Sequence, residues 1–406
     1  MVTVGIVAEF NPFHKGHKYI IDKARQITGA DNVIVICSGN FVQRGEPAIF
    51  DKTVRTKSAL ANGVDAVFEL PVYYSTASAE TFARASVKFL TELGFVDYIC
   101  FGSESDHIKI LPTIANVLAN EPAEYKDALK KELQTGLSFP KARVNALKSY
   151  FALNGSLSID EIEITMRSPN NILAIEYIKA IKNFGSSIKP VAIKRIGADY
   201  SSLDTIDDYV SATAIRNQAY LGNDILNFIP ENCEDYIKEY KPLFIHDFNI
   251  ILGTSLINNN NFDEFYDINK DLANRINNQK NNYTDIEHFM MQLDSKNFTR
   301  TSISRSLFHI LLNIKNQYIR EAIEDNYFTH ARLLGINRGS NLMSVINDNS
   351  NINIISRYSD YYRNASGLDK KLLDISLYAD EIYRLAYMTK YKEIIPNEFE
   401  RQIVVK

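Results

Sequence analysis

The sequence predicts a doubly wound, Rossmann-like α/β domain built on a parallel sheet, followed by a mainly helical domain. In the first half, short runs that are apolar on both faces alternate with amphipathic segments, a pattern typical of parallel strands covered by helices on both sides. Beyond about residue 222, helical patterns dominate. A length of 406 residues also exceeds the usual size of one domain. We therefore expect a first domain over residues 1–220 and a mainly helical second domain over 221–406.

The first half divides into alternating strands and helices. Strands are expected at the apolar runs Val2–Ala8, Asn32–Cys37, Ala66–Leu70, Tyr98–Phe101 and Pro190–Lys194. Helices are expected at Lys18–Thr28, Asp51–Asn62, Ser78–Leu93, Pro140–Phe151, Asn170–Phe184 and Ala212–Leu221, with one or two more within Leu111–Leu133. This order is that of successive βαβ units, whose strands pair in parallel.

Each helix is predicted from apolar residues at helical spacing. The segment 170–184 repeats isoleucine at positions 172, 175, 178 and 181, which places all four on one face. In the second half, Ser302–Asn316 shows the same spacing. The segment Asn258–Tyr283 is rich in asparagine and is either an RNA-contacting loop or a surface element shaped by compositional drift.

Composition and charge exclude several classes of protein. The net charge of −4 argues against a globally basic nucleic-acid binder, so any RNA contact must come from a local patch. Cys37, Cys100 and Cys233 show no metal-ligand or redox spacing, which indicates structural thiols in a reducing compartment. The N-terminus reads as a strand rather than a signal peptide, and no apolar run approaches 18 residues. We expect a cytoplasmic protein with no membrane partner.

The strongest chemical signal is the run FNPFHKGH, which lies between the first strand and the first helix. It places His14 and His17 at the carboxyl end of a parallel strand, next to the free N–H groups and positive dipole of a helix N-terminus. Gly16 lets a ligand approach the backbone closely. Such a turn can hold a triphosphate and stabilise charge that develops on its α-phosphorus. The alternatives are a surface histidine pair or a metal site, but no acidic or cysteine partner lies nearby, so we expect no metal ligands.

A second signal is VSATAIR, which precedes the helix expected from Ala212. Ser211 can cap that helix, with Thr213 close to its start and Arg216 one turn further on. The run is either a capped helix with a solvated arginine or a second phosphate clamp facing the histidines. In the second case Arg216 joins His14 and His17 as a catalytic residue.

Longer strings resemble one family. GIVAEFNPFHKGH, SGNFVQRGEPAIFDK, GVDAVFELP, FGSES, SPNNILAIEYIKA, KRIGADY and VSATAIR occur in the order typical of the tRNA(Met) cytidine acetate ligase family, within the HxGH nucleotidyltransferase superfamily. LFHILL, ARLLGIN and ADEIYRLAY extend the resemblance over nearly the whole chain. The first domain is then expected to be the ATP-binding nucleotidyltransferase domain, and the second is expected to contact tRNA.

The resemblance implies an AMP-forming ligase with ATP, acetate and elongator tRNA(Met) as partners. Acetate would attack the α-phosphate of ATP, giving acetyl-adenylate and pyrophosphate. The N4 amine of the wobble cytidine would then take the acetyl group, giving N4-acetylcytidine and AMP. ATP is expected as a substrate in its Mg-ATP form, with no tightly bound cofactor. The chain departs from many synthetases in lacking a KMSKS-like lysine string, so VSATAIR must take that role.

The resemblance also carries over a set of nucleotide contacts. They are Val7, Ala8, Glu9, Phe10, Asn11, Pro12, Phe13, His14, Lys15, Gly16, His17, Lys18, Tyr19, Ile20, Gly102, Asn170, Arg195, Ile196, Ser211 and Thr213. Three have structural alternatives: Gly102 as a strand-end turn, Asn170 as a helix cap and Arg195 as a solvated cation.

Several assignments stay open. Two segments have open roles, namely Gln43–Pro47 and Asp51–Lys52. They could line the pocket for acetate or cytidine, or they could brace the loop. Basic residues recur along the second half and form either a solvated face or a tRNA contact; they are Arg300, Arg305, Lys315, Arg320, Arg332 and Arg338. The rival functions are a small-molecule adenylyltransferase of the same fold and a non-catalytic RNA-binding protein.

Overall fold

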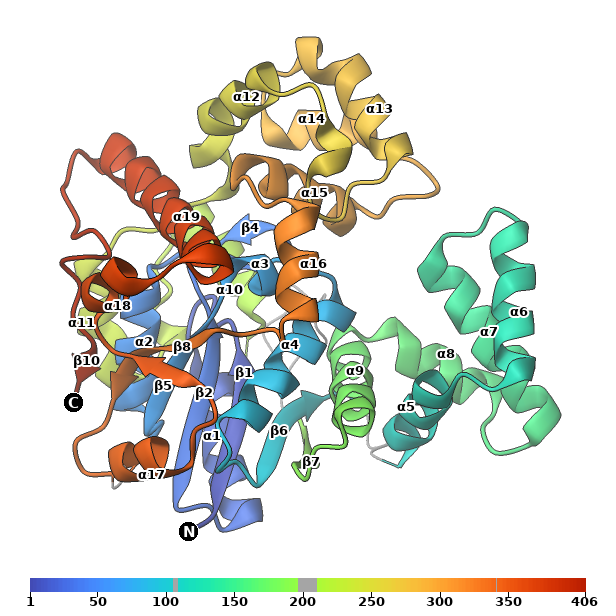
Figure 1. Ribbon diagram of the computed structural model, residues 1–406, viewed down its shortest axis with the longest axis horizontal. Helices are drawn as coiled ribbons and strands as arrows, with labels where there is room; N and C mark the ends of the chain where they lie inside the picture. The colour runs from blue at the N-terminus through green and yellow to red at the C-terminus, as the bar shows by residue number, and fades with distance from the viewer. Residues whose placement is uncertain (105–108, 196–209, 341) are drawn as a thin grey trace.

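A single large sheet organises the molecule (Figure 1). The computed structural model describes residues 1–104, 109–195, 210–340 and 342–406. Within these ranges, eight strands pair in the order β10-β8-β5-β2-β1-β6-β7, with β9 beside β8. They are β1 (Thr3–Ala8), β2 (Asn32–Ser38), β5 (Ala66–Leu70), β6 (Tyr98–Ser103), β7 (Lys189–Lys194), β8 (His330–Ile336), β9 (Asn353–Ile355) and β10 (Val404–Val405). The run from β5 to β7 is parallel, whereas β8 is antiparallel to β5.

Helices cover both faces of the sheet, and successive residues of β2 serve opposite faces. Ile34 and Ile36 pack in one hydrophobic cluster with α4 and α9, while Val33 and Val35 pack in a second cluster with α1, α2 and α10. These helices are α1 (Lys15–Thr28), α2 (Lys52–Ala61), α4 (Ala79–Glu92), α9 (Pro169–Phe184) and α10 (Ala212–Tyr220). The doubly wound α/β domain predicted from the sequence is confirmed.

The predicted elements of the first half agree closely with the structure. The strand expected at Ala66–Leu70 has those bounds, and the strand at Asn32 extends one residue further, to Ser38. The first helix begins at Lys15 rather than at Lys18, because His14 caps it. The last three residues of the FNPFHKGH motif, Lys15, Gly16 and His17, therefore lie within the helix.

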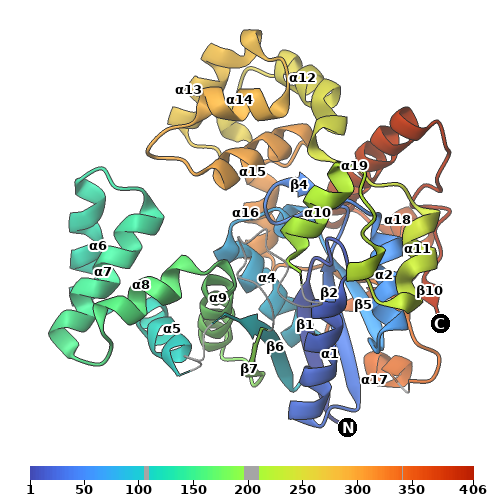
Figure 2. The ribbon, with the colours of Figure 1, turned by 180° about the vertical axis from the view of Figure 1, so that it is seen from behind.

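Two groups of helices project from the sheet in both views (Figures 1 and 2). The first lies between β6 and α9 in sequence and consists of α5 (Ile110–Asn120), α6 (Ala123–Gln134), α7 (Phe139–Asn154) and α8 (Ile159–Arg167). The segment Leu111–Leu133, expected as one or two helices, thus forms parts of two, separated at Glu121 and Pro122. The helix α8 was not predicted.

The second group follows residue 248 in the sequence and includes α12 (Asn249–Asn258), α13 (Lys270–Gln279), α14 (Ile286–Leu293), α15 (Arg300–Leu311) and α16 (Asn316–Glu324). The single helix expected at Ser302–Asn316 is wrong: α15 ends at Leu311, and Asn313 adopts a positive φ of 54° before α16 begins. The asparagine-rich segment folds into α13 and short 3-10 turns, with Phe262, Phe265 and Ile276 buried beneath them.

The end of the chain returns to the sheet. The strands β8, β9 and β10, which the sequence did not predict, extend it beyond β5. The remaining elements are β3 (Phe41–Val42), β4 (Glu46–Pro47), α3 (Val72–Ser75), α11 (Glu234–Glu239), α17 (Leu342–Asn349), α18 (Tyr358–Asn364) and α19 (Gly367–Tyr391). The division of the chain near residue 220 stays a prediction. Among the described helices, none combines the length and the apolar character needed to span a bilayer.

Candidate functional site

A cavity of about 320 Å³ opens at the carboxyl ends of β1 and β6, between α1, α9 and α10. This is the place where ligands bind in open α/β sheets. Its polar side chains are those of Glu9, Asn11, His14, His17, Gln43, Arg44, Asn170, Arg195, Ser211 and Arg216. The apolar part includes Phe82, Phe101, Leu173 and Tyr177. The site therefore combines cations and amides with aromatic and aliphatic side chains.

The two imidazoles form a reciprocal cap at the start of α1. His14 Nδ1 accepts a hydrogen bond from the backbone N–H of Gly16 at 3.0 Å, and His17 Nδ1 accepts one from the backbone N–H of His14 at 3.2 Å. The ring centroids are 3.8 Å apart. The helix terminus thus fixes both rings side by side, in the arrangement that an acidic or hydroxyl capping box has elsewhere.

These hydrogen bonds decide which nitrogen of each ring carries the proton. A backbone N–H can only donate, so both Nδ1 atoms use their lone pairs as acceptors, and a neutral imidazole must then carry its proton on Nε2. Burial, with smaller effects of Arg195 and Arg216, lowers the pKa of His14 to about 3. Burial and His14 lower the pKa of His17 well below its ordinary value. Near neutral pH the pair therefore presents two uncharged Nε2–H donors.

The VSATAIR helix meets this turn directly. Ser211 caps α10 by accepting a hydrogen bond from the Ala214 N–H at 3.2 Å. Arg216 donates to the carbonyl oxygen of Asn11 at 2.9 Å and to the Thr213 hydroxyl at 3.2 Å, and lies 3.5 Å from a carboxylate oxygen of Glu46. The arginine lines the cavity and is not a solvated cation, so the two motifs form one site.

Asn11 supports the turn from within. Its side-chain oxygen accepts a hydrogen bond from the Ile49 N–H at 2.8 Å. Its Nδ2 atom is buried and has no hydrogen-bond partner among the described residues. Because Asn11 lines the cavity, this amide is a donor that a ligand could satisfy.

The cavity wall also contains Gly102, Asn170, Arg195 and Ser211, which are nucleotide contacts expected beyond the first turn. Gly102 lies against Arg195, and a Cβ at this glycine would come within 3.1 Å of Arg195 Cγ. Asn170 donates to a carboxylate oxygen of Glu104 at 2.6 Å, and Ser168 rather than Asn170 is the N-cap of α9. Ile196 lies outside the described residues.

Not every residue of the expected set reaches the cavity wall. Val7, Ala8, Phe10 and Ile20 line it, together with the polar members named above, whereas Pro12, Phe13, Lys15, Gly16, Lys18, Tyr19 and Thr213 do not. Phe13 is fully buried, and Lys18 pairs with Asp22 at the surface. The sequence did not predict the apolar wall, because Phe101 and Tyr177 carry no motif and meet only when β6 and α9 pack together.

Residues 43–52 have two different roles. Gln43 and Arg44 line the cavity, and Glu46 is placed next to Arg216. Asp51 instead pairs with Arg401 through contacts of 2.7 and 2.9 Å, at the end of the chain. The segment therefore contributes to the pocket at its start and braces the fold at its end.

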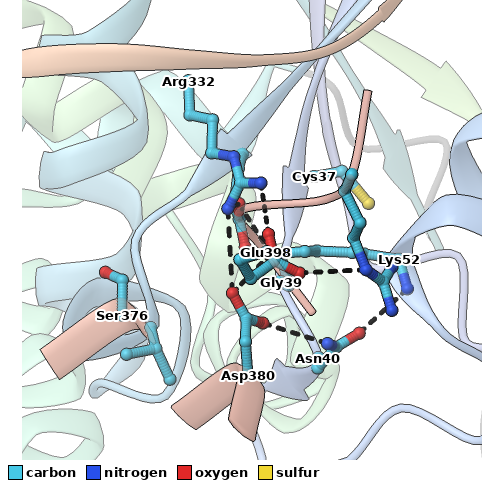
Figure 3. Close-up of polar contacts among 12 residues, drawn as sticks. Cys37, Gly39, Asn40, Lys52, Arg332, Ser376, Asp380 and Glu398 are labelled. Atoms are coloured by element: carbon cyan, nitrogen blue, oxygen red, sulfur yellow. Dashed lines mark hydrogen bonds and ion pairs between the residues drawn. The ribbon is translucent and has the colours of Figure 1, made fainter. Parts of the chain in front are cut away.

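Lys52 lies in a buried cluster of charges (Figure 3). Its ammonium contacts Glu69 at 2.9 Å, Asp380 at 2.6 Å and Glu398 at 3.2 Å, and its side chain is 1% exposed. Arg332 joins the same carboxylates. Burial and the neighbouring Glu398 raise the pKa of Asp380, whereas Lys52 and Arg332 act in the opposite direction. The cluster ties α19 and the C-terminal segment to the sheet.

Four of the six basic residues named for the second half are held in ion pairs. Arg300, Arg305 and Lys315 pair with Glu287, Asp267 and Glu264 respectively. Arg332, expected either on a solvated face or at a tRNA contact, is instead in the buried cluster. The three cysteines are free and buried, as expected for structural thiols. Within the described ranges, no group of three or more His, Cys, Asp or Glu side chains has a geometry suited to a metal ion.

Comparisons with known proteins show which proteins this chain resembles. A family model described as HIGH Nucleotidyl Transferase matches residues 1–397. The tRNA(Met) cytidine acetate ligase of Thermoanaerobacter sp. (strain X514) is 39% identical over 95% of this chain and 96% of its own length. The protein of the same name from Acetivibrio thermocellus is 37% identical over the full length of both chains.

Solved structures extend the likeness to three dimensions. The apo form I crystal structure of Thermotoga maritima TmcAL superposes with a TM-score of 0.93 at 29% identity, covering 100% of this chain and 99% of that chain. A second crystal structure of that protein, bound with alpha-thio ATP, gives a TM-score of 0.91 with the same identity and coverage.

Proposed function

This chain belongs to the HIGH nucleotidyl transferase family and, within it, to the tRNA(Met) cytidine acetate ligases, and we propose that it acetylates elongator tRNA(Met) in two steps. In the first step an acetate oxygen attacks the α-phosphorus of ATP and pyrophosphate leaves. In the second, N4 of the wobble cytidine attacks the acetyl carbon and AMP leaves. The partners are ATP as Mg-ATP, acetate and the tRNA, and we place the enzyme in the cytoplasm.

One observation carries the proposal: the two Nε2–H donors of His14 and His17 lie beside Arg216 in one cavity. Negative charge builds up on the α-phosphate oxygens during displacement, and fixed donors in a partly dry site stabilise that charge. Neutral imidazoles suit this task, because a pair of imidazolium ions so close together would repel each other. Arg216 supplies the formal positive charge, held in place by Asn11 and Thr213.

The rest of the wall suits the nucleoside. The aromatic side chains of Phe101 and Tyr177 offer apolar surface to a purine, and Gly102 lets the ligand approach the β6 backbone. Arg195 and Asn170 add polar contacts at the same end of the cavity. We therefore assign the nucleotide to the polar and apolar parts together, with its phosphates at the α1 turn.

The test supplies ATP, labelled acetate and bulk tRNA, followed by digestion of the RNA. Label in N4-acetylcytidine supports the proposal. AMP retained on a small molecule would point to an adenylyltransferase, and no ATP turnover would point to an RNA-binding protein. The variant His17→Ala should lose acetyl-adenylate formation while remaining folded. His288→Ala is the matched control, because His288 is exposed on α14 and contacts Gln292.

A further inference from the structure

The second chemical step needs a group that accepts a proton. When N4 of cytidine bonds to the acetyl carbon, the bond from that carbon to the phosphate oxygen breaks and its electron pair leaves with AMP. N4 carries one proton too many after the attack, and this proton must move to a base before or as the product forms. The need for this base rests on the proposed function.

The histidines cannot serve as the base. Both Nδ1 lone pairs are engaged by backbone N–H groups, so each neutral ring offers the cavity a donor and no acceptor. The same burial that lowers the pKa of both rings favours this neutral form. Their chemistry is therefore limited to donating hydrogen bonds to phosphate oxygens.

Two other ionisable groups of the wall stay protonated. Burial raises the pKa of the Cys100 thiol to about 12. Burial and the nearby Glu9 raise the pKa of the Tyr177 hydroxyl. Neither group is an anion near neutral pH, and neither can take a proton from an amine.

Glu9 is the only carboxylate among the described residues that line the cavity. It directly follows β1, so it lies at the same edge of the sheet as the imidazole pair. Its Oε1 atom accepts a hydrogen bond from the backbone N–H of Gln43 at 2.8 Å. The described residues give Oε2 no hydrogen bond, which leaves one carboxylate oxygen to meet a substrate.

The backbone of Glu9 is held by a buried arginine of α2. Arg55 is 1% exposed and donates to the carbonyl oxygen of Glu9 at 2.8 Å and to that of Ser38 at 2.8 Å. The carboxyl ends of β1 and β2 are thereby joined through one guanidinium. Such support holds a side chain close to the position that proton transfer requires.

The charges around Glu9 suit a base. Burial and the like charge of Glu46 raise the pKa of Glu9, while the Gln43 N–H, Arg216 and Arg44 act in the opposite direction, and the net shift is upward. Tyr177 from α9 and Cys37 from β2 also face this carboxyl group, and both are protonated. A carboxylate with a raised pKa binds a proton more readily than a surface glutamate does.

We propose that Glu9 is the proton acceptor of the acetyl-transfer step and accepts a hydrogen bond from the cytidine N4 amine as that amine attacks. The N4 proton passes to Glu9 Oε2, and the carboxylic acid then releases it to water once AMP has left. A carboxylate accepting from cytosine N4 is also a specific way to recognise that base. One group thus selects the cytosine and completes the reaction.

The test separates the two steps in Glu9→Gln, which keeps the shape of the side chain and removes the base. Acetate-dependent exchange of labelled pyrophosphate into ATP should fall less than acetyl transfer does, because Glu9 also lines the nucleotide cavity. Single-turnover acetyl transfer from preformed acetyl-adenylate to tRNA should fall by about 10²–10⁴-fold. The parent transfer rate should rise with pH and level off above the pKa of Glu9, and the variant should lose this dependence. Glu80→Gln, which alters a carboxylate paired with Lys179 outside the cavity wall, is the matched control.

Glu9→Asp keeps a carboxylate on a shorter side chain, so it should transfer slowly and retain the pH dependence. If Glu9→Gln does not fold, the transfer rate and pH dependence of Glu9→Asp test the proposal in its place. Parental transfer by Glu9→Gln, or an equal loss of both steps, would overturn the proposal. A parent enzyme that never labels a tRNA cytidine would instead refute the proposed function, so the two failures are distinguishable.

Discussion

Arg216 and Asn11 lie 205 positions apart in the sequence and are joined by a hydrogen bond of 2.9 Å from the guanidinium to the carbonyl oxygen. This contact links the start of α10 to the turn that precedes α1. The arginine is therefore fixed relative to the imidazole pair, and we expect both motifs to contact the same ligand.

We expect Arg216→Lys to impair the first step while leaving the fold intact. A lysine cannot reproduce the two-pronged contact to Asn11 and Thr213, so its charge would be poorly placed on the phosphates. Acetate-dependent pyrophosphate exchange should fall about 10²-fold, the usual effect of losing one preorganised donor. Arg384→Lys is the control, because Arg384 pairs with Glu381 on α19. Equal exchange rates in both variants would show that Arg216 has no special role.

Gly102→Ala should weaken ATP binding through Arg195. The added methyl group would lie 3.1 Å from Arg195 Cγ and 3.3 Å from Cδ, so the arginine side chain must shift by a few tenths of an ångström. We expect the KM for ATP to rise several-fold with little change in unfolding temperature. Gly339→Ala is the matched control, because a Cβ there meets nothing closer than 3.6 Å. An unchanged KM would remove Arg195 from the nucleotide site.

The lowered histidine pKa values make stability depend on pH in a defined direction. His14 has a pKa of about 3 in the folded protein and an ordinary value of 6.5. Between these values the unfolded chain binds a proton that the folded chain does not, so the free energy of unfolding falls as pH falls below 6.5. Above that range the contribution is constant.

His14→Asn isolates this effect, because asparagine keeps a cap acceptor for the Gly16 N–H but does not titrate. Urea denaturation from pH 7 to pH 4 should show that the free energy of unfolding of the parent falls more than that of the variant. Parallel curves over that range would mean that His14 is not held neutral by the fold.

Lys52→Met should destabilise the protein strongly. Removing the ammonium leaves Glu69, Asp380 and Glu398 buried with less compensating charge. We expect a loss of about 3–5 kcal/mol in the free energy of unfolding, measured by urea denaturation. Lys18→Met removes an exposed pair with Asp22 and should cost under about 1 kcal/mol. Similar losses in the two variants would contradict a structural role for the buried cluster.

Much of the sheet and half of the site were predictable from the sequence. The strands at Asn32 and Ala66 are continuous apolar runs, and such runs can be assigned without knowing their neighbours. His14, His17 and Arg216 carry motifs whose local chemistry indicates phosphate binding. The start of α1 was three residues out, because histidine is an unusual capping residue and gives no ordinary start signal.

The parts of the fold and the site that the sequence did not predict depend on contacts between distant segments. The strand β8 contains His330 and Arg332 and was not recognised, because Arg332 reads as a surface cation until Glu69, Asp380 and Glu398 neutralise it. Tyr177 lies on a helix face that reads as ordinary core. Only the packing of α9 against β6 brings it to the cavity.

The most direct test of the central claim is a crystal structure of the protein with ATP or a non-hydrolysable analogue. We expect the Nε2 atoms of His14 and His17 to lie about 3 Å from phosphate oxygens, with Arg216 on the same phosphates. A triphosphate bound away from the α1 turn, or imidazoles that make no contact with it, would contradict the account.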